Sequence, residues 1–422
     1  MTPRAALPFL GKRRASQDHF TVLDIGTSMV KALIVKREGE QGIVIGCGKA
    51  PQKQNDMQAG AVANIQSVID TCETALSDAE DMCETIPSQV IIGIAGEQVY
   101  GALTTVAFPR QRPTAKISQA ELASAIQLLQ RRSLRNAVKE MSTALGVDEI
   151  NIKLVHSVIT SIDIDGHPVN NPVEFQGQKI TISVFNTFAP ISHIGALQTI
   201  ADELDLDLIA TIAEPYALAR ACATEALLES GAIFIDVGSG TTDVALISDR
   251  TIAGMKMCAL GGRSFTRRLM TDMSMTYEQA EQFKVAYSQE ELPLEQRRHA
   301  HELFLPPAEV LAHSVGLIIE ELAPESDPPS HIALAGGGSI LPDVLEQLKL
   351  LNWKDVMPVA YNPIITVLHP DSVKGMFDST GTLVSAQDVT PLAIGYYAMT
   401  MHDPESAPLG ALMQRVLQTM KV

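Results

Sequence analysis

The chain has 422 residues, of which 46% are hydrophobic and 19% are charged. This composition is typical of a folded protein, and the length exceeds what one core supports, so we expect more than one domain. The formal net charge of −17 disfavours sequence-independent binding to nucleic acid, which depends on clustered Lys and Arg. The five cysteines have no CxxC or His/Cys spacing, which indicates reduced thiols of a cytosolic protein and no cysteine-based metal site.

The first 19 residues form a basic segment that contains Arg4, Lys12, Arg13 and Arg14. The segment lacks an apolar run long enough for a secretory signal. No apolar stretch elsewhere approaches the roughly 18 residues that span a bilayer. We expect a flexible N-terminal tail, and the alternative is a basic arm that touches anionic lipid.

The first part of the chain has the pattern of an α/β domain. Residues 20–35 alternate around a Gly-containing turn, which predicts a β-hairpin, and residues 42–47 add a strand. Helical apolar spacing predicts a helix over residues 64–79, and a continuous apolar run predicts a buried strand over residues 90–94. This order of elements favours a domain in which helices cover a sheet.

The character of the sequence changes after Gly96. Ser118 and Glu121 have the spacing of a capping box and predict the start of a helix. Two alternating segments, 152–164 and 179–188, predict strands after it, so we expect a compact α+β insertion. The helix carries basic residues that we interpret as a solvated face, with a partner surface as the alternative; they are Arg131, Arg132, Arg135 and Lys139.

The second half repeats the pattern of the first. Residues 191–204 have helical spacing, and the apolar run 208–213 ends at Glu214 and Pro215. Residues 233–247 repeat the hairpin pattern of residues 20–35, which indicates an internal duplication. Further helices are predicted over 277–287, 306–322 and 341–349, a strand over 332–335 and a loop over 324–329.

Three Gly-containing turns follow apolar runs, in the sequences DIGTSMVK (24–31), DVGSGTTD (236–243) and ALAGGGS (333–339). Glycine permits tight turns in which backbone N–H groups approach a phosphate closely. The first turn supplies Gly26, Thr27 and Ser28, and the second supplies Gly238, Ser239, Gly240, Thr241 and Thr242. Lys31 lies on the strand that leaves the first turn and could contact phosphate as a point charge.

Asp24 and Asp236 end the strands that lead into the first two turns. Two carboxylates beside phosphate turns suit a Mg²⁺ ion that keeps several waters, so we expect binding through water. Each motif alone is more often a plain hairpin turn or loop. The joint order of three motifs at strand ends favours a nucleotide cleft between two similar halves.

These motifs resemble those of the actin-like ATPase superfamily, which includes actin, chaperone ATPases and sugar kinases. Residues 24–31 and 236–243 resemble its two phosphate motifs, and 333–342 its adenosine motif. The adenosine motif contains Gly336, Gly337, Gly338 and Ser339. The resemblance implies ATP or ADP with Mg²⁺ as cofactors. It also implies that Glu214 positions the attacking water and that Asp236 serves both Mg²⁺ and that water. Residues 214–217 and 391–395 resemble the two connecting motifs.

Within this superfamily the chain resembles the FtsA family of bacterial division proteins. Residues 100–180 occupy the place of that family's inserted small α+β (SHS2-type) subdomain, which replaces one actin subdomain, and NPVEFQG (171–177) resembles a segment near its end. AEQFK (280–284) resembles the family's helix near the adenosine and implies roles there for Glu281 and Lys284. Ser239 stands where the family often has Gly, and residues 357–391 form a connection longer than usual.

The resemblance implies an α/β, actin-like ATPase fold built from two duplicated RNase H-like domains. The implied parts are a flexible tail (1–19), a first domain (20–99 and 181–228 with about 386–401), the inserted subdomain (100–180), a second domain (229–263 and 330–385) with its smaller half (264–329), a linker (402–408) and an amphipathic helix (409–422).

The C-terminal segment has one apolar stripe with polar and basic residues opposite and no acidic residue. The stripe consists of Leu409, Leu412, Met413, Val416, Leu417 and Met420. FtsA proteins end in a helix that lies on the membrane, and this pattern suits an interfacial helix. The alternative is a terminal helix docked on the protein's own core. We expect weak membrane binding that needs self-association to add avidity.

The resemblance implies a protein that self-assembles into protofilaments and tethers the tubulin-like FtsZ ring, through the FtsZ C-terminal tail, to the inner face of the cell membrane at the division site. Further division proteins are implied as partners of the inserted subdomain, and any ATPase activity is expected to be weak. Two alternatives stay open. One is an adaptor of the same superfamily that resembles PilM of type IV pilus assembly, and the other is a small-molecule kinase.

Overall fold

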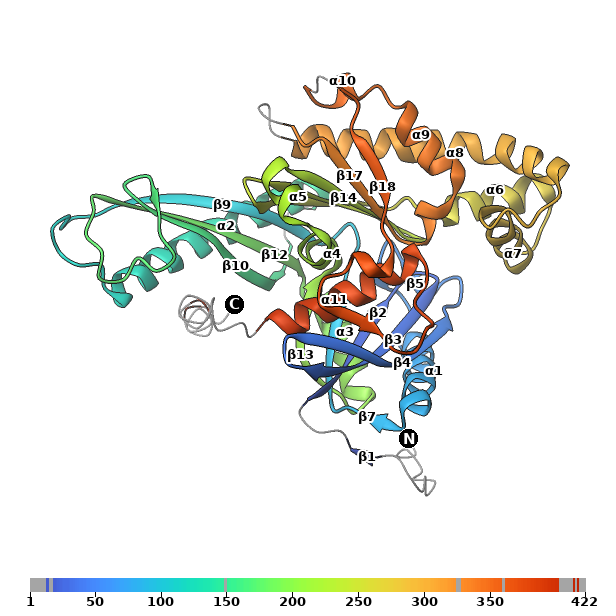
Figure 1. Cartoon of the computed structure of the whole chain (residues 1–422), viewed down its shortest axis with the longest axis horizontal. Coiled ribbons are helices and arrows are strands. Elements are labelled where there is room, and N and C mark those ends of the chain that lie inside the picture. Colours follow the sequence, from blue (N-terminus) through green and yellow to red (C-terminus); the bar gives the residue numbers. More distant parts are fainter. Residues whose placement is uncertain are drawn as a thin grey trace.

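Two β-sheets with helices around them form the body of the molecule in the computed structural model (Figure 1). The structure describes residues 13–14, 18–147, 150–323, 328–358 and 361–401 together with Met413 and Val416. Most of the C-terminal helix predicted over 409–422, most of the N-terminal tail predicted over 1–19, the linker predicted over 402–408 and residues 324–327 of the loop predicted over 324–329 lie outside the described residues. Arg13 and Arg14 form a short strand, β1, which pairs in parallel with β7, Thr85–Ile86.

The first sheet has the strand order β13-β8-β2-β3-β4-β19. The hairpin predicted at its centre is confirmed, because β2 (His19–Ile25) pairs antiparallel with β3 (Met29–Glu38). The other strands are β4 (Gln41–Pro51), β8 (Gln89–Ile94), β13 (Asp207–Ala213) and β19 (Met376–Asp378). Strands β8 and β13 run parallel to β2, as expected of an α/β sheet that helices cover.

The second sheet repeats this order in β16-β15-β14-β17-β18. Its hairpin joins β14 (Ala232–Val237) to β15 (Thr242–Ser248), and β17 (His331–Ala335) runs parallel beside β14. Strands β16 (Thr251–Cys258) and β18 (Ile364–Val367) complete it. Position by position, β4-β3-β2-β8-β13 corresponds to β16-β15-β14-β17-β18, so the duplication inferred from the hairpin motifs extends to five strands.

Helices flank both sheets. Helix α1 (Ile65–Cys83) packs on β3 and β4, and its predicted start is confirmed by the Asn64 side chain, which accepts a hydrogen bond from Ser67 N. The helices of the first core also include α3 (Ile191–Glu203), α4 (Glu214–Cys222), α5 (Glu225–Ser230) and α11 (Val389–Thr400). The second core is covered by α6 (Arg263–Met273), α7 (Tyr277–Ser288), α8 (Leu294–Leu322), α9 (Pro342–Leu350) and α10 (Trp353–Val356).

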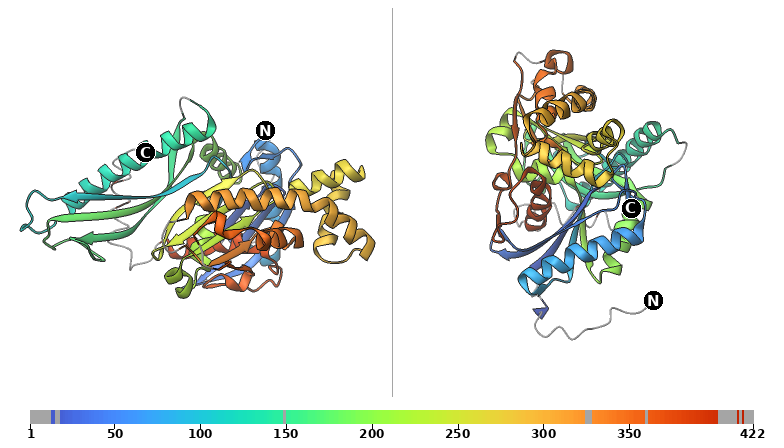
Figure 2. Two further views of the ribbon diagram at one scale, coloured as in Figure 1. Left: turned by 90° about the horizontal axis from the view of Figure 1, so that it is seen from above. Right: turned by 90° about the vertical axis from the view of Figure 1, so that its right-hand side faces the viewer.

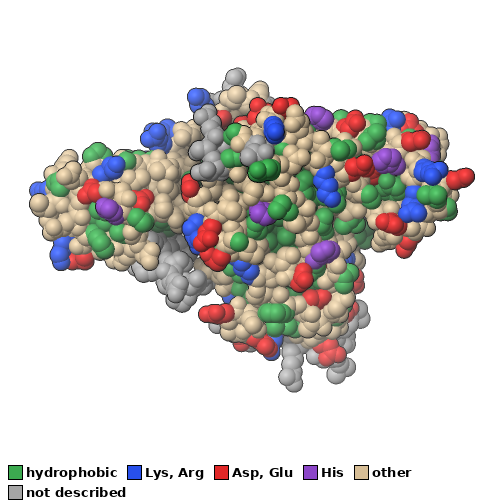
Figure 3. All heavy atoms as spheres, turned by 45° about the horizontal axis from the view of Figure 1, so that its top comes forward, with side chains coloured by type: hydrophobic (Ala, Val, Ile, Leu, Met, Phe, Trp, Pro, Cys, Tyr) green, Lys and Arg blue, Asp and Glu red, His purple; other side chains and the backbone are tan. Residues whose placement is uncertain are grey.

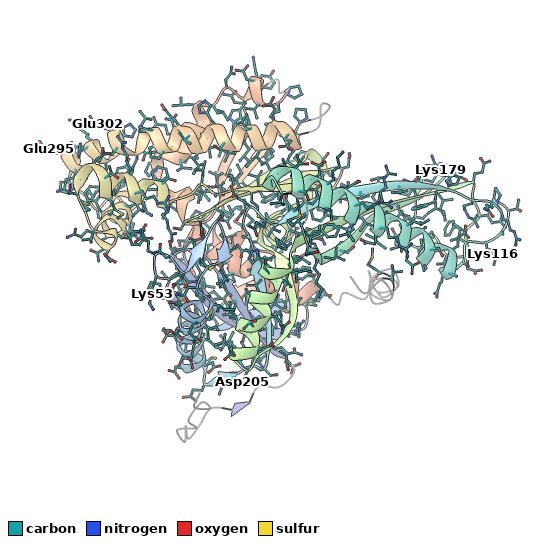
Figure 4. The ribbon with its side chains drawn as sticks, turned by 180° about the vertical axis from the view of Figure 1, so that it is seen from behind. Lys53, Lys116, Lys179, Asp205, Glu295 and Glu302 are labelled. Carbon is teal, nitrogen blue, oxygen red and sulfur yellow. The ribbon has the colours of Figure 1, made fainter. Side chains whose placement is uncertain are left out.

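The inserted subdomain extends from the body as an antiparallel sheet with one long helix (Figures 1 and 2). It consists of β9 (Tyr100–Pro109), α2 (Gln119–Leu145), β10 (Ile152–Ile164), β11 (His167–Pro168) and β12 (Lys179–Pro190). Strand β9 was not predicted. It also pairs with β16 at Gly101 and Met255, so the sheet of the insertion continues into the second sheet. Figure 4 shows Lys116 at the tip of this subdomain and Glu302 at the opposite end of the molecule.

One predicted helix start is confirmed and another is wrong. Ser118 caps α2 as predicted, but Glu121 does not return the second bond of a capping box, because its carboxylate accepts from the Arg110 guanidinium, 2.7 Å from Nε. Helix α8 begins at Leu294, twelve residues before the predicted start, and contains Pro306 and Pro307. Proline inside a helix costs about 3 kcal/mol, but the extra turns bury Phe304 against Phe265 and Tyr287, so packing overrides the local signal.

Helix α8 also corrects the expectation that no segment could span a bilayer. By length and composition alone it is the one described helix that passes that test. Its buried residues, such as Leu311 and Val315, belong to the second core, which is the usual position of a long apolar helix in a soluble domain.

The long connection over residues 357–391 now has a structural account. It contributes β18 to the edge of the second sheet and β19 to the edge of the first sheet. It then forms a short 3₁₀ turn, Ala386–Asp388, which leads into α11. The Asp388 carboxylate accepts from Lys49 Nζ at 2.6 Å. One segment therefore completes both sheets and brings residues 387–390 between them.

Candidate nucleotide site

The two predicted phosphate turns have the same backbone geometry and face each other between the sheets. Gly26 N donates to Met29 O at 3.1 Å in the first turn, and Gly238 N donates to Thr241 O at 2.9 Å in the second. Ser28 of the first turn donates a hydroxyl hydrogen bond to Ser239 of the second. Two segments separated by 211 positions in the chain thus meet as the sequence order predicted.

Two glycines show why these turns exclude side chains. A Cβ on Gly240 would lie 2.6 Å from Thr27 Oγ1, in the opposite turn. Gly336 has a φ of +84°, and a Cβ there would lie 2.0 Å from Asp236 Oδ1. Glycine is therefore required at both positions by close approach and, at Gly336, by the backbone conformation as well.

The duplicated hairpins place one charged pair in each half at the same position. Asp24 and Lys31 are directly opposite across β2 and β3, and Asp236 and Asp243 are directly opposite across β14 and β15. The second half therefore has a carboxylate where the first has an ammonium group. Lys31 Nζ is 3.0 Å from Asp24 Oδ2 and donates to Gln387 O at 2.7 Å. Although burial alone would lower the pKa of Lys31, the Asp24 carboxylate raises it overall.

Glu214 completes an acidic group around the cavity. It is the first residue of α4, where Pro215 in the first turn fixes the start of the helix. A Cβ on Gly93 would lie 2.6 Å from Glu214 Oε1, so the bare backbone of β8 makes room for this carboxyl. Burial, followed by the nearby Asp24, Asp243 and Asp236, raises the pKa of Glu214 well above its usual range.

The second hairpin adds two further buried acids. Burial raises the pKa of Asp236, and a hydrogen bond from the Thr390 hydroxyl partly offsets this rise. Burial and the Asp236 charge raise the pKa of Asp243 well above its usual value. The Asp243 Oδ1 atom is buried and has no hydrogen-bond partner among the described residues. Buried carboxylates of this kind favour a site that receives a cation.

The residues present fit a hydrated Mg²⁺ ion next to a polyphosphate. In the described part of the chain, no group of three or more His, Cys, Asp or Glu side chains is placed to hold a metal ion directly. Asp24, Glu214, Asp236 and Asp243 nevertheless line one cavity, with Lys31 also in its lining. This arrangement suits an ion that binds one or two carboxylates through water and takes further oxygens from phosphate, as the sequence predicted for Asp24 and Asp236.

The cavity between the turns has a volume of about 150 Å³. Most predicted site residues line it, namely Asp24, Gly26, Thr27, Ser28, Lys31, Glu214, Asp236, Gly238, Ser239, Thr241, Gly336 and Gly337. Six do not: Gly240, Thr242, Glu281, Lys284, Gly338 and Ser339. Gly240 still contacts Thr27, whereas the buried Thr242 hydroxyl donates to Leu260 O at 2.8 Å and so points away from the cavity.

The residues assigned to adenosine by resemblance lie close to the second turn. Lys284 Nζ is 2.8 Å from Glu281 Oε1 and donates to Gly262 O at 3.2 Å. Gly262 N in turn donates to Gly238 O at 2.9 Å. Gly338 and Ser339 are buried in the 3₁₀ turn Gly337–Ile340 that follows β17. Helix α7 and the third glycine cluster thus flank the same end of the second sheet.

Sequence reasoning missed four polar residues that line this cavity: Asp243, Gln387, Thr390 and His193. Asp243 could have been found, because the hairpin register places it opposite Asp236. Gln387 and Thr390 arrive through the long connection, and His193 through α3. No local sequence motif marks these three residues as part of the site, because their position in the cavity depends on how distant segments of the chain pack together.

Solved structures of similar fold cover almost the whole chain. The PilM–PilN type IV pilus biogenesis complex matches with a TM-score of 0.62 at 15% identity, over 89% of this chain and 97% of that one. The ethanolamine utilization protein EutJ from Carboxydothermus hydrogenoformans matches with a TM-score of 0.50 at 14% identity, over 91% and 92%. At these identities the likeness establishes the fold alone. The chain has the fold of the actin-like ATPases, as predicted.

Comparison with curated proteins gives a more specific relationship, although no family model matches the chain. The cell division protein FtsA of Neisseria meningitidis serogroup B is 27% identical over 273 residues, which are 64% of this chain and 62% of that protein. FtsA of Streptococcus pneumoniae serotype 2 is 23% identical over 352 residues, 79% and 73% of the two chains. The chain is related to FtsA, and its match spans less than two thirds of the Neisseria protein.

Proposed function

We propose that this chain is an actin-like cell division protein that binds ATP with Mg²⁺ between its two halves. The observation that carries the proposal is the pair of equivalent turns that face each other beside four carboxylates that line one cavity. Backbone N–H groups of such turns suit phosphate oxygens, and the carboxylates need a cation when they ionise. The relationship to FtsA supports the division role.

In this proposal, different residues of the cleft bind phosphate, carry positive charge and orient water. Gly26, Thr27 and Ser28 of the first turn, and Gly238 to Thr241 of the second, hold the phosphates, with Lys31 as a fixed positive charge. Bound Mg²⁺ supplies charge neutralisation at the phosphates. Glu214, whose raised pKa suits proton transfer, orients the attacking water. The cleft then acts mainly by positioning the phosphates and the water, which allows slow hydrolysis of ATP. The bound nucleotide chiefly controls whether the chain polymerises.

The partners follow from the relationship to FtsA and remain part of the proposal. They are a second copy of the chain in a protofilament, the C-terminal tail of FtsZ, lipid at the inner face of the membrane, and further division proteins at the inserted subdomain. Nucleic acid is not among them. On the face drawn in Figure 3, Lys and Arg side chains of the described residues are scattered among Asp and Glu, with no continuous basic patch.

A binding experiment with the FtsZ C-terminal peptide separates the division role from the pilus adaptor role. The full chain, with ATP and Mg²⁺, should be retained on the immobilised peptide and not on a scrambled peptide of the same composition. Retention on immobilised PilN instead would favour a PilM-like adaptor. Phosphate transfer to a small-molecule acceptor in a screen with ATP would favour the kinase alternative.

A vesicle experiment tests the membrane part. The full chain should co-sediment with anionic vesicles more than a variant that lacks residues 409–422, because that segment carries the apolar stripe. Raising the protein concentration should strengthen binding of the full chain through avidity. Equal sedimentation of the two proteins would contradict a membrane role for the segment.

A further inference from the structure

Two residues of the C-terminal segment are buried against the inserted subdomain. The side chains of Met413 and Val416 are only 3% and 2% exposed. They belong to the same apolar cluster as Leu122 and Ile126 of α2 and Ile162 of β10. Both residues are helical and lie three positions apart, which places them on one face of a helix.

These two residues fill the space between α2 and β10, which we call the groove. Helix α2 packs mainly against β9 and β12, which leaves the face of β10 on that side with less cover from α2. Met413 lies over this part of the sheet, because its sulfur is 3.7 Å from the Ser157 hydroxyl of β10 and 3.5 Å from Gln130 Nε2 of α2. Met413 and Val416 therefore cover the edge between α2 and β10.

The floor of this groove is a buried polar network. Gln130 is 3% exposed, and its Nε2 donates to Ser157 Oγ at 2.8 Å and to Asn186 Oδ1 at 3.1 Å. Asn186 in turn donates to Ser133 Oγ at 2.9 Å. A thioether is a polarisable side chain that tolerates such polar neighbours while it fills an irregular gap. The groove thus fits a methionine better than a branched aliphatic side chain at this position.

The path of the chain explains why its own C-terminus is the occupant. Helix α11 ends next to β10, since the Tyr397 ring lies 6.2 Å from the ring of His156, the residue before Ser157. Met401, just after α11, packs against the first core. Met413 follows Met401 by twelve positions, and a chain of that length spans at most about 40 Å. A tether this short keeps the segment at a high effective concentration near the groove.

We propose that the groove between α2 and β10 is a docking site for the chain's own C-terminal segment, and that docking withholds this segment from lipid. Met413 and Val416 lie on the apolar stripe that would enter the membrane, so one stripe cannot occupy the groove and the bilayer at once. The proposal that the segment docks in the groove is argued from the structure. The proposal that docking withholds the segment from lipid rests on the membrane role proposed above.

A cleavable cross-link tests both halves in the full chain. Ser157→Cys with Met413→Cys places two thiols in contact, and Cys83→Ser with Cys258→Ser removes the two native thiols that are not buried. A short bis-methanethiosulfonate bridges close thiols, and reductant cleaves the bridge. The matched control is Ser118→Cys with Met413→Cys. Ser118 precedes Gln130 by twelve residues, or about 18 Å along α2.

We expect bridging within single chains for the 157–413 pair, at least about tenfold more than for the control pair. We also expect the bridged protein to stay in solution with anionic vesicles and to sediment after reduction. Equal bridging of both pairs, or bridging mainly between chains, would overturn docking in the same molecule. Equal sedimentation of bridged and reduced protein would overturn the withholding. If the 157–413 pair is bridged but reduced protein does not sediment, the membrane role and the withholding fail while docking stands.

Discussion

Thr27 of the first turn and Gly240 of the second are in contact across the cleft, where a Cβ on Gly240 would lie 2.6 Å from Thr27 Oγ1 and 2.7 Å from its Cγ2. The hydrogen bond between Ser28 and Ser239 joins the turns beside this contact. Thr27 and Gly240 thus set how closely the two turns approach each other. We infer that this contact limits how far the two halves can close.

Gly240→Ala should therefore shift the cleft toward an open arrangement. The added methyl group overlaps the Thr27 side chain, and overpacking of this kind costs about 1–3 kcal/mol. The corresponding change in the closed-to-open ratio is about 5- to 150-fold. Small-angle scattering without nucleotide should show a larger radius of gyration. Adding Thr27→Gly removes the overlap and should restore the compact value. A Gly240→Ala protein as compact as its parent would contradict the contact.

Asp236→Ala should weaken binding of ATP in the presence of Mg²⁺ much more than binding of ATP without it. Asp236 is one of the two carboxylates that we expect to hold the ion through water, and bonds to charged groups contribute about 1.5–3 kcal/mol each. The expected loss of affinity is about 10- to 150-fold. Calorimetric titration with and without Mg²⁺ measures it. Asp70→Ala, on the exposed side of α1, is the matched control, and retained tight binding by Asp236→Ala would refute the assignment.

Glu214→Gln should stabilise the nucleotide-free protein, and increasingly so as the pH rises. The folded state holds the proton of Glu214 above pH 4.5, because burial and three carboxylates raise its pKa, whereas the unfolded chain releases it. The free energy of unfolding therefore falls with rising pH, by at most about 1.4 kcal/mol per unit. Glutamine does not ionise, so Glu214→Gln removes this pH-dependent loss of stability.

Thermal midpoints at pH 5 and pH 8 measure this effect. The gain from Glu214→Gln should be larger at pH 8, while the exposed Glu203→Gln should change little at either pH. The same substitution should lower ATP hydrolysis by about 10²-fold or more, since it removes the group proposed to orient water. A gain that is equal at both pH values would show that Glu214 is not held protonated in the fold.

The sequence allowed the central strands and turns to be predicted because their signals are local. Alternation around Gly26 and Gly238 marks both hairpins, and the repeat of Asp24 at Asp236 reveals the duplication. Strand β9 was not predicted, although half-buried and exposed residues alternate regularly along its second half. The pairing of β9 with β16 depends on Gly101, whose missing side chain leaves room for Met255, and nothing in the local sequence marks that approach.

The C-terminal stripe shows a different limit of sequence reasoning. An amphipathic pattern predicts that a helix buries one face, but it does not say against what. Met413 and Val416 are buried on the inserted subdomain, which is the alternative to lipid that the pattern left open. The polar side chains Gln130 and Ser157, which contact Met413, lie over 250 positions earlier in the chain.

His156 should make the protein less stable as the pH falls below 6.5. Burial lowers the pKa of His156 to about 3, and neither ring nitrogen has a hydrogen-bond partner among the described residues. Its neighbours are the rings of Phe185, Tyr216 and Tyr397. In the unfolded chain His156 becomes protonated near pH 6.5, whereas in the folded protein it stays neutral until about pH 3. The stability that neutral His156 allows is therefore full above pH 6.5 and is lost progressively as the pH falls toward 3.

His156→Leu should remove this dependence and also the cost of an unpaired buried imidazole. Between pH 7 and pH 5 the parent should lose about 2 kcal/mol more of its free energy of unfolding than the variant does. Urea unfolding at the two pH values measures the difference. His193, whose pKa burial lowers to about 4, contributes equally to both proteins and cancels. The exposed His167→Leu should behave like the parent, and parallel losses in parent and His156→Leu would show that His156 is protonated in the folded protein.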